Sequence, residues 1–273
     1  MTARAGATGL VFFAVLAWST PVPAWVQSNS SKGAGLHWPD LCHVVYAYLD
    51  GSADVDDGSD IEAIRLSLET WNAEECSGFT MVWGGLTNMQ WIGYTSYGGN
   101  ANIVIFHEED WPYDQRPVAF TSVTYNPVTG VIFDADIELN AEDYEFTAGG
   151  PDMDPGDIDI QNTITHEAGH IVGLDHSNKV KATMYEYSVF GETVKRTLDK
   201  DDVDGLCTLY PLTGGATTCE EVQKLDLWVD DPDVPPGPAS NPSCTAASQS
   251  ASGSGVLLLL AGIAMLTRRR RMV

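Results

Sequence analysis

The segment from His166 to His176, which reads HEAGHIVGLDH, constrains this 273-residue chain more than any other. Two histidines four apart on a helix lie one turn apart and about 40° from each other around the axis, so His166 and His170 can reach one metal ion. On a continuing helix His176 would point away from that ion. Gly173 stands where the chain has to turn back, because glycine takes the left-handed conformation that ends a helix at little cost. The spacing therefore predicts a helix, a sharp turn and a three-histidine metal site.

The residue types in this segment indicate a catalytic zinc site rather than a structural one. Three neutral imidazoles leave a zinc ion with two positive charges and an open fourth position for water. Glu167 directly follows the first histidine and is predicted to face that water, as the general base for attack on a peptide carbonyl. A bare HExxH also occurs in ordinary helices with surface histidines, whereas the longer pattern with a third histidine is much more specific.

The N-terminal residues are typical of a signal peptide. Arg4 precedes an apolar stretch from Gly9 to Trp18, and small residues lead to Ala24, after which we expect cleavage. A permanent N-terminal anchor is the weaker interpretation, because the apolar stretch is too short to span a bilayer. We therefore expect residues 1–24 to be removed and the protein to be exported.

The chain is strongly acidic, with a formal net charge of -24 at pH 7. Arg4 and Arg268 to Arg271 lie in terminal segments without acidic residues, so the body of the chain is more acidic still. Such a body is repelled by nucleic acid and by anionic lipid. We expect no nucleic-acid partner.

Composition divides the rest of the chain into three parts. Residues 25–212 are expected to form one catalytic domain, and residues 213–254, rich in Pro, Gly, Ser and Asp, read as a linker. Residues 255–273 combine an apolar stretch with a terminal arginine cluster, which predicts a C-terminal membrane anchor or sorting signal with the domain outside. The alternative, a buried helix of the main domain, is poor because the linker isolates this segment.

Five cysteines follow the predicted cleavage point: Cys42, Cys76, Cys207, Cys219 and Cys244. An odd number leaves at least one of them unpaired within the chain, and four can pair in three ways. Cys207 and Cys219 are close enough in sequence for a short local loop. No CxxC occurs, so a thiolate zinc site is not expected.

The secondary-structure pattern is a helix followed by several strands. Ser59 resembles an N-cap with Glu62 as its capping-box partner, and apolar residues at helical spacing continue the helix to near Ala73. Strand-like runs follow at Phe79 to Trp83, Ala101 to Phe106, Val118 to Tyr125 and Val131 to Leu139.

The last of these runs alternates apolar and acidic residues, so Asp134, Asp136 and Glu138 share one face. With loop oxygens they could hold a structural calcium ion, since carboxylates are the ligands that calcium prefers. Hydration of an exposed acidic face explains the pattern equally well. Calcium is thus one of two interpretations here.

The motif and its surroundings resemble the metzincin zinc metalloproteases in their matrixin version. His176-Ser177 is followed by Ala182-Thr183-Met184-Tyr185, where Met184 matches the Met-turn that lies beneath the metal in that family. The resemblance covers roughly Leu36 to Pro211 and includes Leu198-Asp199-Lys200-Asp201-Asp202 near its end.

The resemblance implies an α+β fold, a twisted, mainly parallel five-stranded sheet with one antiparallel edge strand, a backing helix and an active-site helix. It makes residues 118–125 the edge strand, where an extended substrate would pair by β-augmentation. The segment from Glu186 to Lys195 would form the wall of the main specificity pocket.

The chain also departs from the family pattern. Vertebrate-type matrixins carry a pro-segment cysteine that caps the zinc, but Cys42 is better interpreted as a disulfide partner or core residue. Their second, structural zinc needs more histidines than the scattered His37, His43 and His107, so we expect one zinc only. The C-terminal tail resembles myxobacterial surface-sorting signals, with Cys244 as the residue that would be modified.

These observations predict a secreted or cell-surface zinc metalloendopeptidase of a bacterium, a monomer that acts on extracellular proteins or peptides and is attached to the membrane through its tail. The alternative is a non-catalytic binding or adhesion module that retains the zinc scaffold. The intact Glu167 argues against it, because a scaffold needs no base beside the metal.

Overall fold

The computed structural model describes residues 24–96, 100–149, 154–212, 219 and 255–259. The main elements, in chain order, are β2 (Cys42–Tyr48), α1 (Ser59–Asn72), β3 (Thr80–Thr87), β4 (Asn102–His107), β5 (Ala119–Tyr125), β6 (Ile132–Asn140), α2 (Ile160–Val172), α3 (Lys200–Leu209) and β10 (Gly255–Leu259). Shorter elements are β1 (Val26–Gln27), β7 (Phe146–Thr147), β8 (Ile158–Asp159), β9 (Leu174–Asp175) and the 3-10 turn η1 (Val194–Arg196).

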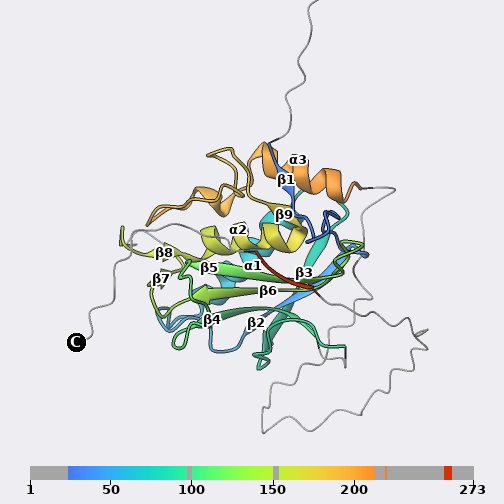
Figure 1. Ribbon diagram of the computed structural model, residues 1–273. Coiled ribbons are helices and arrows are strands. Elements are labelled where there is room, and N and C mark those ends of the chain that lie inside the picture. Colours follow the sequence, from blue (N-terminus) through green and yellow to red (C-terminus); the bar gives the residue numbers. More distant parts are fainter. Residues whose placement is uncertain (1–23, 97–99, 150–153, 213–218, 220–254, 260–273) are drawn as a thin grey trace, which may run out of the picture.

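One sheet with the strand order β10-β5-β6-β4-β2-β3 forms the framework (Figure 1). Strands β3, β2, β4 and β6 run parallel to one another, whereas β5 is antiparallel to β6 and β10 is antiparallel to β5. The prediction of a mainly parallel five-stranded sheet with one antiparallel strand at residues 118–125 is confirmed, but β5 is not the outermost strand of the described sheet. The sixth strand, β10, was not predicted.

Two helices cover one face of this sheet and pack against each other, α1 near β3 and α2 across β5 and β6 (Figure 1). Trp71 at the end of α1 is almost fully buried and donates its indole hydrogen to the carbonyl of Thr165 in α2, at 2.9 Å. Burying an indole of this size with its N–H satisfied is a strong packing contribution. The contact fixes α2, which carries the histidines, against the rest of the core.

The start of α1 differs from the prediction. Ser59 is the first helical residue rather than the cap; the cap position is Gly58, in the left-handed region with φ 78°, and no side chain caps the helix. The Ser59 amide instead donates to Asp57 Oδ1 at 3.0 Å. The predicted capping box with Glu62 is wrong, because the cap residue is a glycine without a side chain and the Glu62 carboxylate pairs with Arg65 instead.

The described cysteines form two long-range disulfides, Cys42–Cys219 and Cys76–Cys207. The short loop between Cys207 and Cys219 suggested by the sequence is not formed, because Cys207, on α3, has its Cα 5.5 Å from that of Cys76. Cys244 lies outside the described residues.

Several predictions concern segments that the structure does not describe: the signal peptide up to residue 23, nearly all of the linker 213–254, and residues 260–273. The described part of the apolar C-terminal segment is strand β10, which pairs with β5. Among the described residues, no helix has the length and apolar character needed to cross a membrane.

Candidate metal centre

Helix α2 places two of the three histidines. Its N-cap Asp159 accepts a hydrogen bond from the Asn162 amide at 2.7 Å, which satisfies one of the free donors at the helix start. The helix ends at Val172, and Gly173 follows with φ 99°. A side chain there would also strike the carbonyl oxygen of Leu36, 2.8 Å from where a Cβ would stand. Glycine is thus required both for the left-handed turn and for the close approach.

That turn brings His176 back to the other two histidines. The potential ligand atoms of His166, His170 and His176 all lie within 4.8 Å of one another, and among the described residues they form the one cluster of metal-binding groups. The ring centroids are 5.0 to 5.3 Å apart. The structure thus brings together the three residues that the sequence singled out.

The ring hydrogen bonds of His166 and His170 leave the other nitrogen of each ring free. His166 Nδ1 lies 2.6 Å from the carbonyl oxygen of Thr183, and His170 Nδ1 lies 2.8 Å from that of Leu174. A ring that donates from Nδ1 presents the lone pair of Nε2. The Nε2 atoms of all three histidines are buried without a hydrogen-bond partner.

Burial also keeps these rings neutral. It lowers the pKa of His166 well below its usual range, that of His170 to about 3, and that of His176 as well. Three neutral imidazoles with converging, unpartnered Nε2 atoms are costly to bury unless a cation binds them. The donor set fits a zinc ion with a fourth position open.

Glu167 lies on the same helix and faces strand β5. Its Oε2 accepts a hydrogen bond from the Thr121 hydroxyl at 2.6 Å, whereas Oε1 is buried without a partner. Burial raises the pKa of Glu167 to about 7, and the Thr121 hydrogen bond and the charge of Lys195 oppose that rise. One carboxylate oxygen is therefore fixed and the other is free to accept a proton.

Met184 packs directly against α2. It is almost fully buried, and a Cβ added to Gly169 would lie 2.1 Å from its sulfur and 2.9 Å from the ring of Trp71. Sequence reasoning gave no role to Gly169, although a glycine in the middle of a helix is a signal of close packing. It is the residue that lets Met184 lie against the helix beside the histidines.

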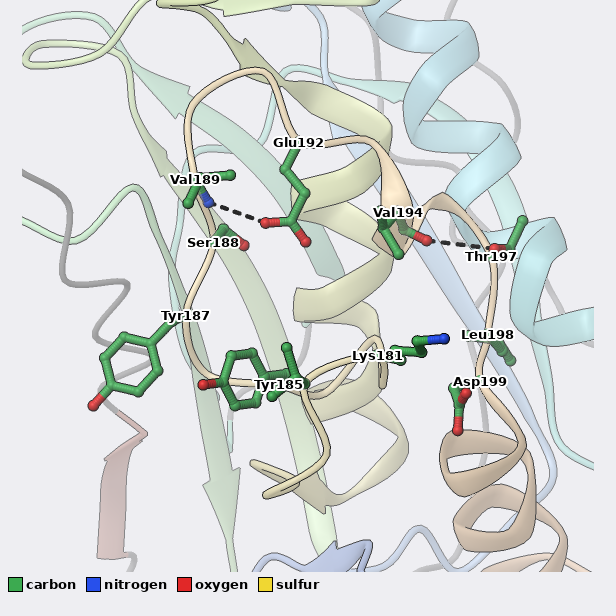
Figure 2. A pocket seen from close by; sticks show the side chains of 11 residues that line it. Lys181, Tyr185, Tyr187, Ser188, Val189, Glu192, Val194, Thr197, Leu198 and Asp199 are labelled. Atoms are coloured by element: carbon green, nitrogen blue, oxygen red, sulfur yellow. Dashed lines mark hydrogen bonds between the residues drawn. The ribbon is translucent and has the colours of Figure 1, made fainter.

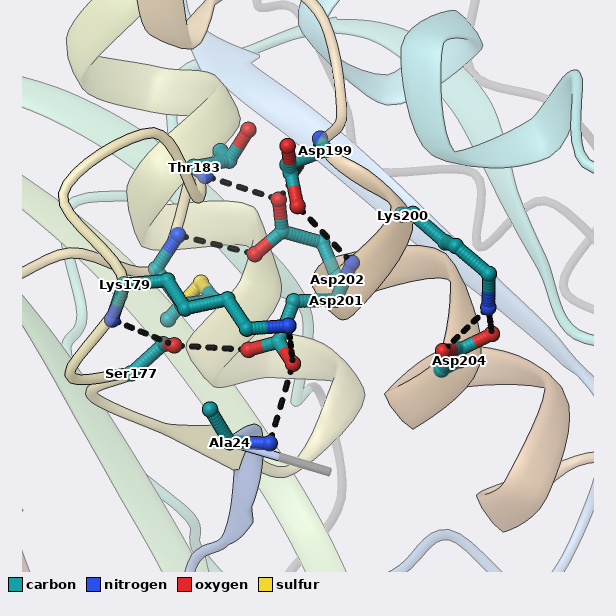
Figure 3. A network of polar contacts seen from close by, with 10 residues as sticks. Ala24, Ser177, Lys179, Thr183, Asp199, Lys200, Asp201, Asp202 and Asp204 are labelled. Atoms are coloured by element: carbon teal, nitrogen blue, oxygen red, sulfur yellow. Dashed lines mark hydrogen bonds and ion pairs between the residues drawn. The ribbon is translucent and has the colours of Figure 1, made fainter. Parts of the chain in front are cut away.

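Two aspartates of α3 hold the loop that carries His176 and Met184 (Figure 3). Asp202 accepts hydrogen bonds from the amides of Thr183 and Met184 at 2.7 and 3.0 Å. Asp201 accepts from the Ser177 hydroxyl at 2.6 Å. Both carboxylates are buried. In the sequence these two residues stand out only through the family resemblance, and their role in holding the loop could not be predicted from it.

Asp201 also contacts the N-terminal end of the described chain. The amide of Ala24 donates to Asp201 Oδ1 at 3.0 Å, and the ammonium of Lys179 lies 3.0 Å from the same oxygen (Figure 3). Strand β1, two residues further on, pairs antiparallel with β9, the strand between Gly173 and His176. Strand β1 thus supports the chain just before His176, and the Ala24 contact, which the predicted cleavage after Ala24 would remove, supports it just after His176 through Asp201.

A pocket of about 700 Å³ lies in the segment that follows Met184. One wall is the loop with Tyr187, Ser188 and Val189, and the other is the chain from Val194 to Asp199 (Figure 2). Apolar groups dominate its lining. The range expected for a specificity wall, residues 186–195, contributes five of the eleven lining residues: Tyr187, Ser188, Val189, Glu192 and Val194.

Lys195 holds the loop of this pocket from within. Its side chain is buried, and Nζ donates to the carbonyl oxygens of Tyr185 and Tyr187 at 2.6 and 3.1 Å and to the Ser188 hydroxyl at 2.6 Å. Burial lowers the pKa of Lys195 to about 8. Sequence reasoning gave Lys195 no role of its own, because nothing in a single sequence marks a lysine as buried.

The three carboxylates of β6 do not form an exposed face. Asp134, Asp136 and Glu138 are each no more than 1% exposed, so hydration does not explain them. Asp136 accepts hydrogen bonds from the amides of Gly93 and Ile103 at 2.6 and 2.9 Å, and Asp134 Oδ2 has no partner among the described residues. Burial raises the pKa of Asp134 to about 6 and that of Asp136 well above its usual value.

Glu138 belongs to a separate contact network. It accepts a hydrogen bond from the Tyr113 hydroxyl at 2.5 Å and lies 2.8 Å from His107 Nε2. Residues four apart on a strand are about 13 Å apart, so one ion cannot bind Asp134 and Glu138 together. Calcium stays a prediction, and in this geometry it concerns the Asp134 and Asp136 pair alone.

Comparisons with known proteins agree with this geometry. The matrixin family of M10 peptidases matches residues 37–211. Metalloendoproteinase 1 of Glycine max is 32% identical over 135 residues, which cover 47% of this chain and 42% of that protein. Karilysin of Tannerella forsythia is 26% identical over 164 residues, or 58% of this chain and 31% of that protein. Human matrix metalloproteinase-16 is 26% identical over 174 residues, which cover 62% of this chain and 26% of that protein. The chain thus matches less than half the length of each of these relatives.

Proposed function

Since the chain belongs to the matrixin family, we propose that it is an exported zinc endopeptidase that hydrolyses peptide bonds of extracellular proteins. The observation that carries the proposal is the convergence of three unpartnered Nε2 atoms beside a carboxylate with one free oxygen. A binding module could use the three histidines to hold a metal ion, but it would have no need of the carboxylate.

His166, His170 and His176 would hold the zinc ion. The ion would supply a Lewis acid for the peptide carbonyl and for the attacking water. Its three ligands carry no charge, so its positive charge remains available for the oxyanion that develops on the substrate.

Glu167 moves the proton. Its free Oε1 takes a proton from the water as the oxygen attacks the carbonyl carbon, while Thr121 holds Oε2 in place. The same oxygen then gives the proton to the amide nitrogen as the C–N bond breaks. The products are a carboxylic acid and an amine, and the carboxylate returns to its starting state.

The pocket and strand β5 would bind the substrate. An extended peptide would add to the edge of β5 by main-chain hydrogen bonds, and one of its side chains would enter the pocket after Met184. The valines and tyrosines of the lining favour an apolar side chain.

Export and domain organisation complete the proposal. Residues 1–24 would be removed, residues 25–212 would form the catalytic domain, residues 213–254 the linker and residues 255–273 the anchor or sorting signal. The two disulfides support an oxidising compartment, because such bonds form and persist outside the cytosol.

The test compares three samples of the exported chain: native, Glu167→Ala, and native stripped of metal and then reloaded with zinc. We expect cleavage of casein or a peptide library by the native and reloaded samples, and a rate lower by several powers of ten in Glu167→Ala. Equal rates in Glu167→Ala would remove Glu167 as the base. A folded, zinc-loaded native chain that cleaved nothing would favour the binding-module alternative.

A further inference from the structure

The outer edge of strand β5 is paired with the chain's own C-terminal region. Residues Gly255 to Leu259 form β10, which runs antiparallel to β5 with Gly255 opposite Tyr125 and Leu259 opposite Thr121. In Figure 1 this strand, in red, lies along β5 at the end of the sheet. The pairing extends over five of the seven residues of β5.

This edge is the one beside the metal centre. The hydroxyl of Thr121 contacts both the carboxylate and the main-chain carbonyl of Glu167, at 2.6 and 3.2 Å. Leu259, the last residue of β10, is the partner of Thr121. An extended segment on this edge therefore ends its pairing at the point of β5 that contacts Glu167.

We propose that the edge of β5 is a peptide-binding surface whose ligand in the intact chain is its own segment Gly255–Leu259, which competes there with protein substrates. The competition rests on the proposed function, whereas occupation of the edge does not. Main-chain hydrogen bonds supply the affinity of such a strand addition.

The covalent connection favours this occupant over any free peptide. Cys219 is held to Cys42 on β2, so the segment that leads to β10 starts from the body of the domain. A chain as long as residues 220–254 can extend over roughly 100 Å, which is ample for reaching β5. A tethered ligand that can reach its site has an effective concentration on the order of 1 mM.

The sequence of this segment indicates which kind of ligand the edge accepts. Residues 255–259 read Gly-Val-Leu-Leu-Leu, uncharged and aliphatic after the glycine. A carboxylate on the ligand would be disfavoured beside so acidic a domain. Extended aliphatic segments without acidic residues are therefore the substrate class we infer for this side of the site.

The first test releases the segment after folding. A recognition site for a specific protease is inserted within residues 220–254, in the otherwise full chain, and the same sample is assayed before and after cutting and removal of the tail. We expect the KM for a fluorogenic peptide to fall about tenfold on release, with kcat unchanged. An unchanged KM would overturn the competition.

The second test does not depend on turnover. In the Glu167→Ala background, a fluorescein-labelled peptide with the sequence of residues 253–261 is titrated against intact and tail-released protein. We expect binding only after release. Binding to neither form, or equally to both, would overturn the proposal. Suppose that the protein with Glu167 intact cleaved no substrate before or after release, while the Glu167→Ala protein bound this peptide after release. The protease function would then be wrong, and occupation of the edge by the segment would stand.

A matched pair of variants guards against effects of the cut. Val256→Pro/Leu257→Pro removes two successive N–H donors, one of which faces β5, because alternate residues of an antiparallel strand point their amides to the same side. The control, Ser248→Pro/Gln249→Pro, makes the same change outside the paired run. We expect the first variant to bind the labelled peptide while its tail is still attached, and the control to bind it only after the tail has been cut off. Equal peptide binding by the two uncut variants would contradict the proposal.

Discussion

The hydroxyl of Thr121 donates a hydrogen bond to Glu167 Oε2 across 2.6 Å, and so joins strand β5 to the carboxylate on helix α2 that we propose as the base. Both residues are fully buried, so water does not replace this contact. It leaves Oε1 as the oxygen that can accept a proton.

Thr121→Val removes the hydroxyl and keeps the shape of the side chain. A hydrogen bond to a charged group contributes about 1.5–3 kcal/mol, so kcat should fall roughly 10- to 100-fold. Thr121→Ser restores the hydroxyl and should recover most of that loss. Steady-state kinetics, with the zinc content of each variant measured in parallel, tests this prediction. A native kcat in Thr121→Val would show that Glu167 does not need the hydrogen bond from residue 121.

His176→Ala should weaken zinc binding by at least about 100-fold, since one of three ligands is lost from a buried site. Competition with a chromogenic chelator measures this affinity. His37→Ala is the control, because among the described residues the His37 ring bonds to the nearby Gly35 carbonyl alone and is not part of the cluster. Native affinity in His176→Ala would remove that residue from the ligand set.

Asp202→Asn should destabilise the domain by about 2–4 kcal/mol, because the amide group cannot accept as strongly from the main-chain donors of Thr183, Met184 and Asp199. Asp204→Asn, which breaks only an exposed pair with Lys200, should cost less than about 1 kcal/mol. Denaturant unfolding of the two variants gives the comparison. Equal losses would mean that the loop does not depend on Asp202.

The Asp134 and Asp136 pair predicts a stability that falls as the pH rises. The pKa of Asp134 in the folded protein is about 6, above the usual value of 3.8, so the folded state binds more protons between these values. The contribution is therefore favourable below about pH 4 and is lost as the pH passes 6, a change of roughly 3 kcal/mol.

The variant Asp134→Asn removes one carboxyl group of the pair and also the negative charge that helps to raise the pKa of Asp136, while the titrating groups outside the pair are shared with the native chain. In urea unfolding with a chelator present, the free energy of unfolding of the variant should increase relative to that of the native protein between pH 4 and pH 7. A difference that stays constant with pH would contradict the shift. If millimolar calcium raised the stability of the native chain at pH 7 and not of the variant, the predicted calcium ion would belong to this pair.

Much of the fold and site could be predicted because local rules decide it. The end of α2 follows from Gly173 alone, and the edge strand at residues 119–125 is bounded by recognisable turns. The positions of His166 and His170 could be predicted for the same reason, because helix geometry places side chains four residues apart on one face of the helix.

Other features depend on residues that are distant in sequence. The alternation in β6 places three acids on one face, but contacts from distant segments, such as the amides of Gly93 and Ile103 at Asp136 and the Tyr113 hydroxyl at Glu138, make that face an interior one. The position of Cys76 opposite Cys207 likewise requires the docking of α3. A period of two cannot tell which face of a strand will be covered.

Strand β10 is the clearest case. A short aliphatic run such as Val256 to Leu259 fits a membrane segment or a buried strand equally well on periodicity. The same residues cannot insert into a bilayer and pair with β5 at one time. The predicted anchor would therefore exclude the observed pairing, and the edge of β5 would be free while the segment was in the bilayer.

The most direct measurement is the zinc X-ray absorption spectrum of the purified, metal-loaded chain, taken beside that of His176→Ala. Three imidazole nitrogens should be found at about 2.0–2.1 Å in the native protein, with one nitrogen fewer in whatever zinc the variant retains. A native spectrum that shows sulfur ligands or fewer than three imidazoles, or one that His176→Ala leaves unchanged, would contradict the account of this site.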